Sequence, residues 1–481
     1  MPDEIPVDIS AEPDAGPDIA APDTADTADT ARLRAAQRRL SVAEARLRRA
    51  EARLASLENS TALRVGQMLA NAARHPARRV PALPRDLYRL WRRRSARTSG
   101  APVIRSAGPA VYEEERLLVG GPTPARPLVA GVLTGPAADA LASVADVLPL
   151  LPHNAGPILA RTQPDLVIVQ AAAATGGAWF GLGDAAAVDL EARLADALRG
   201  VGPRMLLAGT DCPPPLRRLA WDVVTDGDVG VDLRVFHPMA PGPRATAHAL
   251  AWPDDPRAPL TSRRLRTELL AALRDPVAAD APSPAERAAV LRGHRTVIAG
   301  TTAAVVEGLA CGAWVVAPES AVPEDLRPHV IVASDADQLV KQAAALDADR
   351  PYAEVRAALR DVFARYATPA RLAALLSEAG AAEAAADALA GRKVTVLNRG
   401  DRAEPSGTAW VAYEDAQHLD DLLCAAEYAG ADAVGYADID APAYAEAITP
   451  MLARRALAAS GDPAGGWLTR HGARLLTLPR P

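Results

Sequence analysis

The chain has 481 residues and a formal net charge of −6, with 49% apolar and 4% aromatic residues. This length suits two or three domains with a substantial core, and so small a charge gives no reason to expect a polyanion as partner of the whole chain. The cysteines Cys212, Cys311 and Cys424 are far apart and lack Cys-x-x-Cys spacing, which argues against a disulfide framework or a structural zinc. No apolar secretory signal and no run of about 18 apolar residues is present, so a cytoplasmic protein is expected.

Residues 1–30 form an acidic segment with nine Asp or Glu and no Lys or Arg. The segment is also rich in Pro, Ala and Thr. Such a composition cannot bury enough apolar surface to offset the chain entropy lost on folding. We therefore expect a disordered acidic tail at residues 1–30.

Residues 31–58 carry a heptad pattern. A leucine recurs every seven residues, and a second apolar residue follows each leucine by three positions: Leu33, Leu40, Leu47 and Leu54, then Ala36, Ala43, Ala50 and Leu57. This is the a/d seam of nearly four coiled-coil heptads. Two interpretations stay open. The segment is either a short coiled coil that makes a homodimer, or a single arginine-rich helix that packs on its own chain.

Residues 59–126 begin as a basic stretch and end as a linker rich in Gly, Pro and Ser. Between residues 31 and 97 there are 18 arginines and four acidic residues. Leu87, Leu90 and Trp91 share one helical face with arginines beside it, as in helices that lie on anionic lipid. Contact with the inner face of the membrane is one hypothesis, and a solvated linker or pairing with the acidic tail are the others. Nucleic acid is not an expected partner, because no nucleic-acid-binding module follows.

From residue 127 onward, short β-rich runs alternate with Ala-rich helical stretches. Seven runs predict strands: Leu128–Leu133, Asp165–Gln170, Arg204–Gly209, Asp222–Thr225, Thr296–Ala299, Ala313–Pro318 and His329–Ala333. Apolar strands separated by helices indicate an α/β fold with parallel sheets that are covered on both faces. A polar, Pro-rich gap near 241–292 divides this region into two Rossmann-like domains, 127–240 and 241–388. Residues 389–481 predict a separate piece with few strands and a marginal core.

The stretch from Gly300 to Pro318, GTTAAVVEGLACGAWVVAP, predicts a loop of small residues, a helix and a strand. It resembles the donor-binding segment of GT-B glycosyltransferases, in which a helix Glu binds the ribose of a nucleotide-sugar and the helix N-terminus faces the diphosphate. Exposed N–H groups and the helix dipole attract phosphate at such a position. The resemblance implies donor-binding roles for four residues: Glu307, Thr301, Thr302 and Gly312.

Two departures from the GT-B pattern accompany this resemblance. The second acidic residue of the fuller motif is Ala299 here, and no glycine-rich phosphate loop opens the second domain. The resemblance continues over residues 335–371, which match a closing pattern that includes Arg365, Tyr366 and Arg371. In the family this segment crosses back to the first domain, so the match supports the fold more than the chemistry.

Residues 153–226 resemble CgeB-like glycosyltransferases. The matching positions are Asn154, Pro164, Asp165, Gly176, Gly177, Trp179, Asp222, Thr225 and Asp226, while Gln170 replaces the usual Glu. Loops at the carboxyl ends of parallel strands line the interdomain cleft in such folds. The resemblance therefore implies that Gly176, Gly177 and Asp211 lie on the acceptor side. It does not identify the catalytic base, for which Asp211 is our candidate. His237 follows in the phrase VDLRVFHP and is expected to pack at the interdomain linker.

Residues 407–435 resemble the GT-A-type module of multidomain relatives. Of its acidic metal motif, only Glu414 and Asp415 remain. A GT-A site needs clustered carboxylates to hold a divalent ion against a sugar diphosphate. We therefore expect 389–481 to be a degenerate GT-A-like remnant that holds no metal and has no activity of its own.

Together the resemblances imply a glycosyltransferase of the hexosyltransferase type. It would transfer a sugar from a nucleotide-sugar donor to a glycan or cell-envelope acceptor, without a further cofactor. The departures at Ala299 and at the missing phosphate loop leave a second hypothesis open, namely a non-catalytic homologue that acts as a scaffold for partners. A dinucleotide-dependent enzyme is disfavoured, because no G-x-G-x-x-G follows the first predicted strand.

Overall fold

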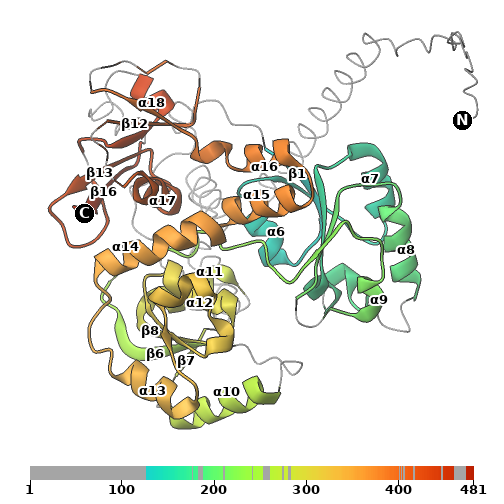
Figure 1. Cartoon of the computed structure of the whole chain (residues 1–481), viewed down its shortest axis with the longest axis horizontal. Helices are drawn as coiled ribbons and strands as arrows, with labels where there is room; N and C mark the ends of the chain where they lie inside the picture. Colours follow the sequence, from blue (N-terminus) through green and yellow to red (C-terminus); the bar gives the residue numbers. More distant parts are fainter. Residues whose placement is uncertain are drawn as a thin grey trace, which may run out of the picture. The chain divides into compact units, whose positions relative to one another are not determined.

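A computed structural model describes residues 126–175, 177–182, 188–209, 212–240, 242–252, 260–273, 276–279, 283–399, 401, 403–404, 407–414, 416, 418–445, 448–459 and 473–481. The expected tail, coiled coil and basic helix all fall in residues 1–125, outside this part of the chain. The described residues form three sheets with helices packed against them (Figure 1).

The first sheet has five parallel strands in the order β2-β1-β3-β4-β5. Its strands are β1 (Leu128–Val132), β2 (Asp146–Pro149), β3 (Leu166–Gln170), β4 (Arg204–Leu207) and β5 (Val223–Thr225). The helices between them are α6 (Gly135–Leu141), α7 (Ala155–Thr162), α8 (Val188–Leu198) and α9 (Pro214–Arg217). Nearly every residue of β1, β3 and β4 is buried, because helices cover both faces of the sheet.

The second sheet is also parallel, in the order β10-β9-β8-β6-β7. Its strands are β6 (Ala245–Ala251), β7 (Val277–Ala278), β8 (His294–Ala299), β9 (Trp314–Ala317) and β10 (Ile331–Val332), and its helices are α10 (Leu260–Ala272), α11 (Pro284–Gly293), α12 (Thr302–Ala310) and α13 (Ala336–Ala344). Numbered from its own first strand, each sheet has the order 2-1-3-4-5 of doubly wound folds. The prediction of an α/β fold with parallel, Rossmann-like sheets is confirmed.

The chain then returns to the first sheet. Helix α14 (Tyr352–Asp361) is followed by a π-helical turn, η5 (Val362–Tyr366), and by helices α15 (Thr368–Glu378) and α16 (Ala382–Ala388). Leu372 and Leu376 of α15 are buried in the same core cluster as Val129 and Leu141 of the first sheet and its helix. The expected crossing back to the first half is therefore confirmed (Figure 1).

Residues from 394 onward form a mixed sheet in the order β11-β12-β15-β13-β16-β14. Its strands are β11 (Val394–Leu397), β12 (Trp410–Tyr413), β13 (Ala433–Ala437), β14 (Ala443–Ala445), β15 (Leu452–Arg454) and β16 (Leu475–Pro479), with helices α17 (Leu419–Ala429) and α18 (Arg455–Ala459). The expectation of few strands was wrong. Segments such as AVGYA and AYA contain alanine and glycine, which give little β signal in a sequence.

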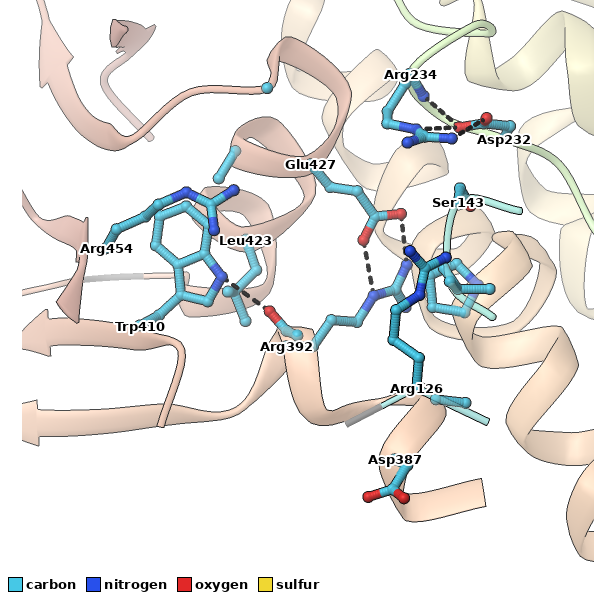
Figure 2. Close-up of a pocket in the computed structure, with 16 residues that line it drawn as sticks. Arg126, Ser143, Asp232, Arg234, Asp387, Arg392, Trp410, Leu423, Glu427 and Arg454 are labelled. Carbon is cyan, nitrogen blue, oxygen red and sulfur yellow. Dashed lines mark hydrogen bonds and ion pairs between the residues drawn. The ribbon is translucent and has the colours of Figure 1, made fainter. Parts of the chain in front are cut away.

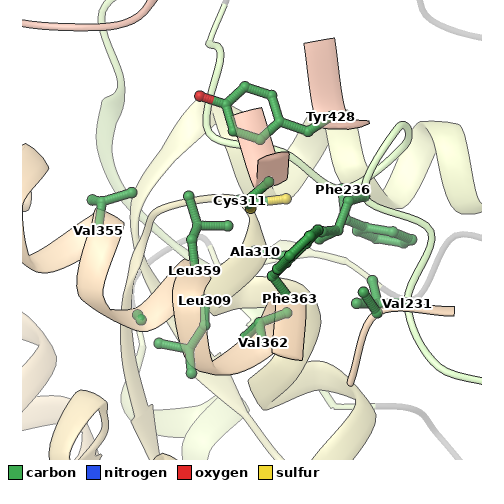
Figure 3. Packing of buried hydrophobic residues seen from close by; sticks show 14 of the residues in the cluster. Val231, Phe236, Leu309, Ala310, Cys311, Val355, Leu359, Val362, Phe363 and Tyr428 are labelled. Atoms are coloured by element: carbon green, nitrogen blue, oxygen red, sulfur yellow. The ribbon is translucent and has the colours of Figure 1, made fainter. Parts of the chain in front are cut away.

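The C-terminal sheet shares its core with the second parallel sheet. Leu422 and Tyr428 of α17 belong to the same buried cluster as Val355, Phe363 and Cys311. Figure 3 shows Tyr428 near Cys311 within this cluster. The C-terminal sheet also has a small core of its own, which includes Val411, Leu457 and Leu475. The shared cluster adds to this core, which answers the difficulty of stabilising so small a unit alone.

Buried ion pairs reinforce this junction. Asp421 of α17 has a side chain that is only 1% exposed, and it accepts hydrogen bonds from Arg360 of α14 and pairs with Arg356 at 3.0 Å. Glu427 of α17 pairs with Arg392 at 2.8 Å. A buried carboxylate is tolerated only where charges and hydrogen bonds compensate for its lost hydration. Arg356 and Arg360 therefore fix α17 against α14.

Substitution Asp421→Asn removes the charge that compensates Arg356 and Arg360. We expect the variant to lose about 3 kcal/mol of unfolding free energy, because the half-buried Arg356 is left without its partner. The neighbouring Asp420 is exposed, so Asp420→Asn is the matched control, with an expected change within about 0.5 kcal/mol. Denaturant unfolding of the full chain measures both, and equal stabilities of the two variants would contradict the role given to Asp421.

The three cysteines are free thiols in the structure, in agreement with the prediction against disulfides. Within the described ranges, no helix combines the length and the apolar character needed to cross a membrane.

Candidate functional site

A cleft of about 780 Å³ lies at the carboxyl ends of strands from both parallel sheets. The first sheet contributes Thr134 after β1, Gln170 of β3, Gly209 after β4 and the loop 226–230 after β5. The second sheet contributes the first turn of α12 and Glu307. Open α/β sheets bind ligands outside the carboxyl ends of their strands, so this cleft is the candidate site.

The first turn of α12 faces the cleft through Thr301, Thr302 and Ala303. Thr301 is the N-cap residue, and its hydroxyl accepts a hydrogen bond from the backbone N–H of Ala304 at 3.2 Å. The Thr302 hydroxyl donates to the carbonyl of Ala321 at 3.1 Å. Because backbone N–H groups at a helix start point outward along the axis, this end of α12 favours an anion. The structure thus brings Thr301, Thr302 and Glu307 together in the cleft.

Glu307 lies on α12 with its side chain 13% exposed. Arg287 of α11 donates to both of its carboxylate oxygens at 2.7 Å, and the same guanidinium lies 5.4 Å from the centre of the Phe236 ring. Burial raises the pKa of the Glu307 carboxyl, and Arg287 opposes part of that rise. A carboxylate has about four acceptor positions, so the bidentate contact leaves positions for a ligand hydroxyl.

Gly312 lies at the opposite end of α12, and it is not among the residues that line the cleft. Its φ is +71°, its N–H donates to the carbonyl of Leu309 at 2.9 Å, and the N–H of Ala313 donates to that of Gly308 at 3.2 Å. This pair of bonds is a Schellman motif, in which glycine takes the left-handed position. In this structure Gly312 ends the helix.

On the acceptor side, Gly176 and Asp211 lie outside the described residues. Gly177 begins the short 3₁₀ turn Gly177–Trp179, and the indole N–H of Trp179 donates to the carbonyl of Leu150 at 2.7 Å. Trp179 lines a separate, mostly apolar pocket of about 100 Å³. Trp179 does not line the cleft.

Gln170 has a position that the sequence did not reveal. Its side-chain oxygen accepts hydrogen bonds from the N–H of Thr134 at 3.1 Å and from its hydroxyl at 3.0 Å. This contact joins the carboxyl ends of β1 and β3, the neighbouring strands at which the order of the first sheet reverses. The departure from Glu to Gln noted in the resemblance therefore falls directly in the cleft wall.

Among the described residues, three arginines line the cleft: Arg287, Arg365 and Arg371. Arg365 pairs with Asp325 at 2.7 Å. The Nε of Arg371 donates to the carbonyl of Asp228 at 3.1 Å, and no salt bridge joins it to a carboxylate within the described part of the chain. No local signal in the sequence points to Arg287, because its partner Glu307 is twenty positions away on another helix.

Two features mark the departures from the family pattern. Ala299 ends β8 with no exposed surface, so an acidic residue there would meet the core. A Cβ added to Gly300 would lie 2.1 Å from the Trp252 ring. Trp252 follows β6, so its ring fills the space beside β8 at the point where the order of the second sheet reverses.

A second pocket, of about 410 Å³, lies where the C-terminal sheet meets the preceding elements (Figure 2). Three of the arginines that line it pair with acidic residues: Arg392 with Glu427 at 2.8 Å, Arg234 with Asp232 at 2.7 Å and Arg454 with Asp432 at 3.1 Å. Arg126 donates to the carbonyls of Ala142 and Ala145. The indole N–H of Trp410 donates to the carbonyl of Gly391 at 2.9 Å. Arg392 also donates to the carbonyl of Phe363 at 2.9 Å, so it joins α17 to the turn η5, and we assign the pocket to the interface.

His237 is buried, with 7% of its surface exposed, and its ring stacks on that of Tyr428 at 6.2 Å between centroids. Burial and the nearby Arg292 lower the pKa of the imidazole to about 3. The ring is therefore neutral near pH 7 and does not line the cleft. Its packing at the linker is as predicted.

No protein-family model matches the chain, and no curated protein matches it as a relative. Within the described ranges, no three His, Cys, Asp or Glu side chains come close enough together to hold a metal ion. Asp415, half of the shortened acidic motif, lies outside those ranges.

The depressed pKa of His237 predicts a pH dependence of stability. Because the folded-state pKa is about 3 and the unfolded value is about 6.5, this group favours folding fully above pH 6.5 and loses that contribution as pH falls towards 3. Substitution His237→Gln removes the titrating group. Between pH 7 and pH 4.5, the unfolding free energy of the wild type should fall more steeply than that of His237→Gln, while the exposed His153→Gln should follow the wild type. Parallel curves for all three proteins would rule out a buried neutral His237.

Proposed function

We propose that the chain is a GT-B-type glycosyltransferase that binds a nucleotide-sugar in the 780 Å³ cleft and transfers the sugar to a glycan or cell-envelope acceptor. One observation carries the proposal: Glu307 and the first turn of α12 line the same cleft as the carboxyl ends of the first sheet. The resemblances over residues 153–226 and 300–371 assign these two walls to acceptor and donor.

On the donor wall, the carboxylate of Glu307 would accept hydrogen bonds from the ribose hydroxyls. A hydrogen bond to an ionised group contributes about 1.5–3 kcal/mol. Arg287 holds the carboxylate by a bidentate contact and so limits the directions in which it accepts. The diphosphate would lie against the N–H groups of Thr302 and Ala303, where the helix dipole stabilises negative charge.

On the acceptor wall, the reaction needs a base close to the acceptor hydroxyl. The acceptor oxygen forms a bond to the anomeric carbon while the bond from that carbon to the diphosphate oxygen breaks, and the hydroxyl proton passes to the base. Asp211 remains the proposed base, and Gly176 and Gly177 remain the proposed acceptor-side residues. Nucleoside diphosphate leaves with the electron pair of the broken bond, so no further cofactor is required.

A second candidate function is a non-catalytic homologue that binds partner proteins. The observation that favours it is the Trp252 ring beside Gly300, together with the buried Ala299. In the GT-B pattern that residues 300–318 resemble, an acidic residue stands at the position of Ala299, and Gly300 opens the loop that faces the diphosphate. In this alternative, the heptads at 31–58 make a homodimer and the basic segment at 59–97 contacts the inner face of the membrane.

The first function predicts nucleotide binding that depends on the ribose. UDP-, GDP- and TDP-sugars at millimolar concentration should raise the melting temperature. At a hundredfold excess over Kd, the free energy of unfolding increases by about 2.7 kcal/mol. With the best nucleotide, the wild type should prefer ribose over 2′,3′-dideoxyribose by about tenfold or more, and Glu307→Ala should lose this preference.

Arg287→Ala breaks the same ion pair from the other side but keeps the carboxylate, so it is the control for stability. It should keep part of the preference for ribose over dideoxyribose, because Glu307 is present but no longer held by the bidentate contact. Absence of stabilisation by every nucleotide-sugar would support the non-catalytic alternative. Binding with an unchanged ribose preference in Glu307→Ala would place the ribose elsewhere.

A further inference from the structure

Arg371 has a distinct position in the cleft wall. It lies in the first turn of α15, the helix that returns to the first sheet. The next residue, Leu372, has no exposed surface and belongs to the core of the first sheet. The guanidinium lies on the loop that follows β5, because its Nε donates to the carbonyl of Asp228 at 3.1 Å. Arg371 thus lies on the wall of the cleft that the first sheet provides.

Two glycines in this loop make room for the side chain. A Cβ added to Gly227 would lie 1.7 Å from Nη2 of Arg371. A Cβ added to Gly230 would lie 2.9 Å from the Cβ of Arg371, and Gly230 has a φ of +81° that disfavours other residues. The loop therefore allows the guanidinium to lie directly on its backbone, at the edge of the cleft.

Arg371 differs from the other cleft arginines in how its charge is compensated. Glu307 compensates Arg287, and Asp325 compensates Arg365. Arg371 has a backbone carbonyl as its acceptor and makes no salt bridge within the described residues. A guanidinium has N–H donors on all three nitrogens, so the contact of Nε leaves the donors of the two terminal nitrogens for a ligand.

We propose that Arg371 binds a phosphate group of the ligand that occupies the cleft. A guanidinium fork matches the oxygens of phosphate and binds them by paired, charge-assisted hydrogen bonds. The existence of this phosphate site is argued from the position of Arg371. Only the identity of the molecule that carries the phosphate rests on the proposed function. The phosphate is either the diphosphate of the donor or a phosphate carried by the acceptor, since both would lie in the same cleft.

The test uses the full-length chain and ligands that separate these sources. Pyrophosphate, UDP, uridine and glucose 1-phosphate are titrated by calorimetry into the wild type, Arg371→Gln and Arg371→Lys. If Arg371 binds the donor, Arg371→Gln should weaken pyrophosphate and UDP roughly 10- to 100-fold and leave uridine unchanged. If it binds the acceptor, the loss should fall on glucose 1-phosphate in the presence of saturating UDP. Arg371→Lys keeps the charge without the fork, so it should recover part of the lost affinity.

Arg161→Gln is the control for loss of one positive charge, because Arg161 is an exposed arginine of α7 that does not line the cleft. It should bind every ligand like the wild type. Gly227→Ala provides a second route, since the added Cβ displaces the guanidinium without removing it, and it should weaken the same phosphate ligand as Arg371→Gln. Thermal melting of each variant identifies a change that only affects folding.

Equal loss for uridine and for the phosphate ligands in Arg371→Gln, or no loss for any of them, would overturn the proposal. This outcome is distinct from failure of the proposed function. Pyrophosphate binding that depends on Arg371, without any binding of nucleotide-sugars, would keep the phosphate site and reject the donor site.

Discussion

The cleft depends on one pair of backbone hydrogen bonds where the chain passes twice between the two parallel sheets. The N–H of Val231 donates to the carbonyl of Tyr366 at 2.8 Å, and the N–H of Thr368 donates back to the carbonyl of Val231 at 3.0 Å. In the first bond the outgoing segment is the donor, and in the second bond the returning segment is the donor. A Cβ at Gly230 would lie 2.5 Å from the Tyr366 carbonyl oxygen, so glycine is required for this close approach. Because the two passes are tied together, the carboxyl ends of both sheets border a single cleft.

The π-helical turn η5 sets the direction of the returning segment. The N–H of Ala367 donates to the carbonyl of Val362 at 2.8 Å, a five-residue step that ends α14 and lets the chain reach Val231. Tyr366, the last residue of this turn, donates its hydroxyl to Asp325 at 2.7 Å. Burial and that hydrogen bond raise the pKa of the Tyr366 phenol, so the donor is retained at neutral pH. The same turn thus fixes the crossing, the start of α15 and, through α15, the position of Arg371.

Continuous apolar runs were the part of the fold that the sequence could predict. All seven predicted strands are present, since runs such as LVIVQ are typical of parallel strands covered on both faces. Strand β6 was missed because ATAHALA has small residues and little β signal, and β13 was missed for the same reason. The motif located Glu307 in the cleft. It could not locate Arg287, since that contact exists only once α11 packs against α12.

The choice between the two proposed functions, a glycosyltransferase and a non-catalytic homologue, depends on how the cleft would hold a diphosphate. On the second sheet, the chain departs from the GT-B pattern that residues 300–318 resemble, because the buried Ala299 stands where that pattern has an acidic residue and the Trp252 ring fills the space beside Gly300. The first turn of α12 remains, but a helix start alone supplies only partial charge. Arg371 supplies a full positive charge from the opposite wall, and its position follows from the hydrogen bonds between Val231 and the returning segment. If the cleft binds a nucleotide-sugar, Arg371 is then the cleft residue whose positive charge is available to its diphosphate, and loss of Arg371 should affect binding more than any change on the second sheet outside α12.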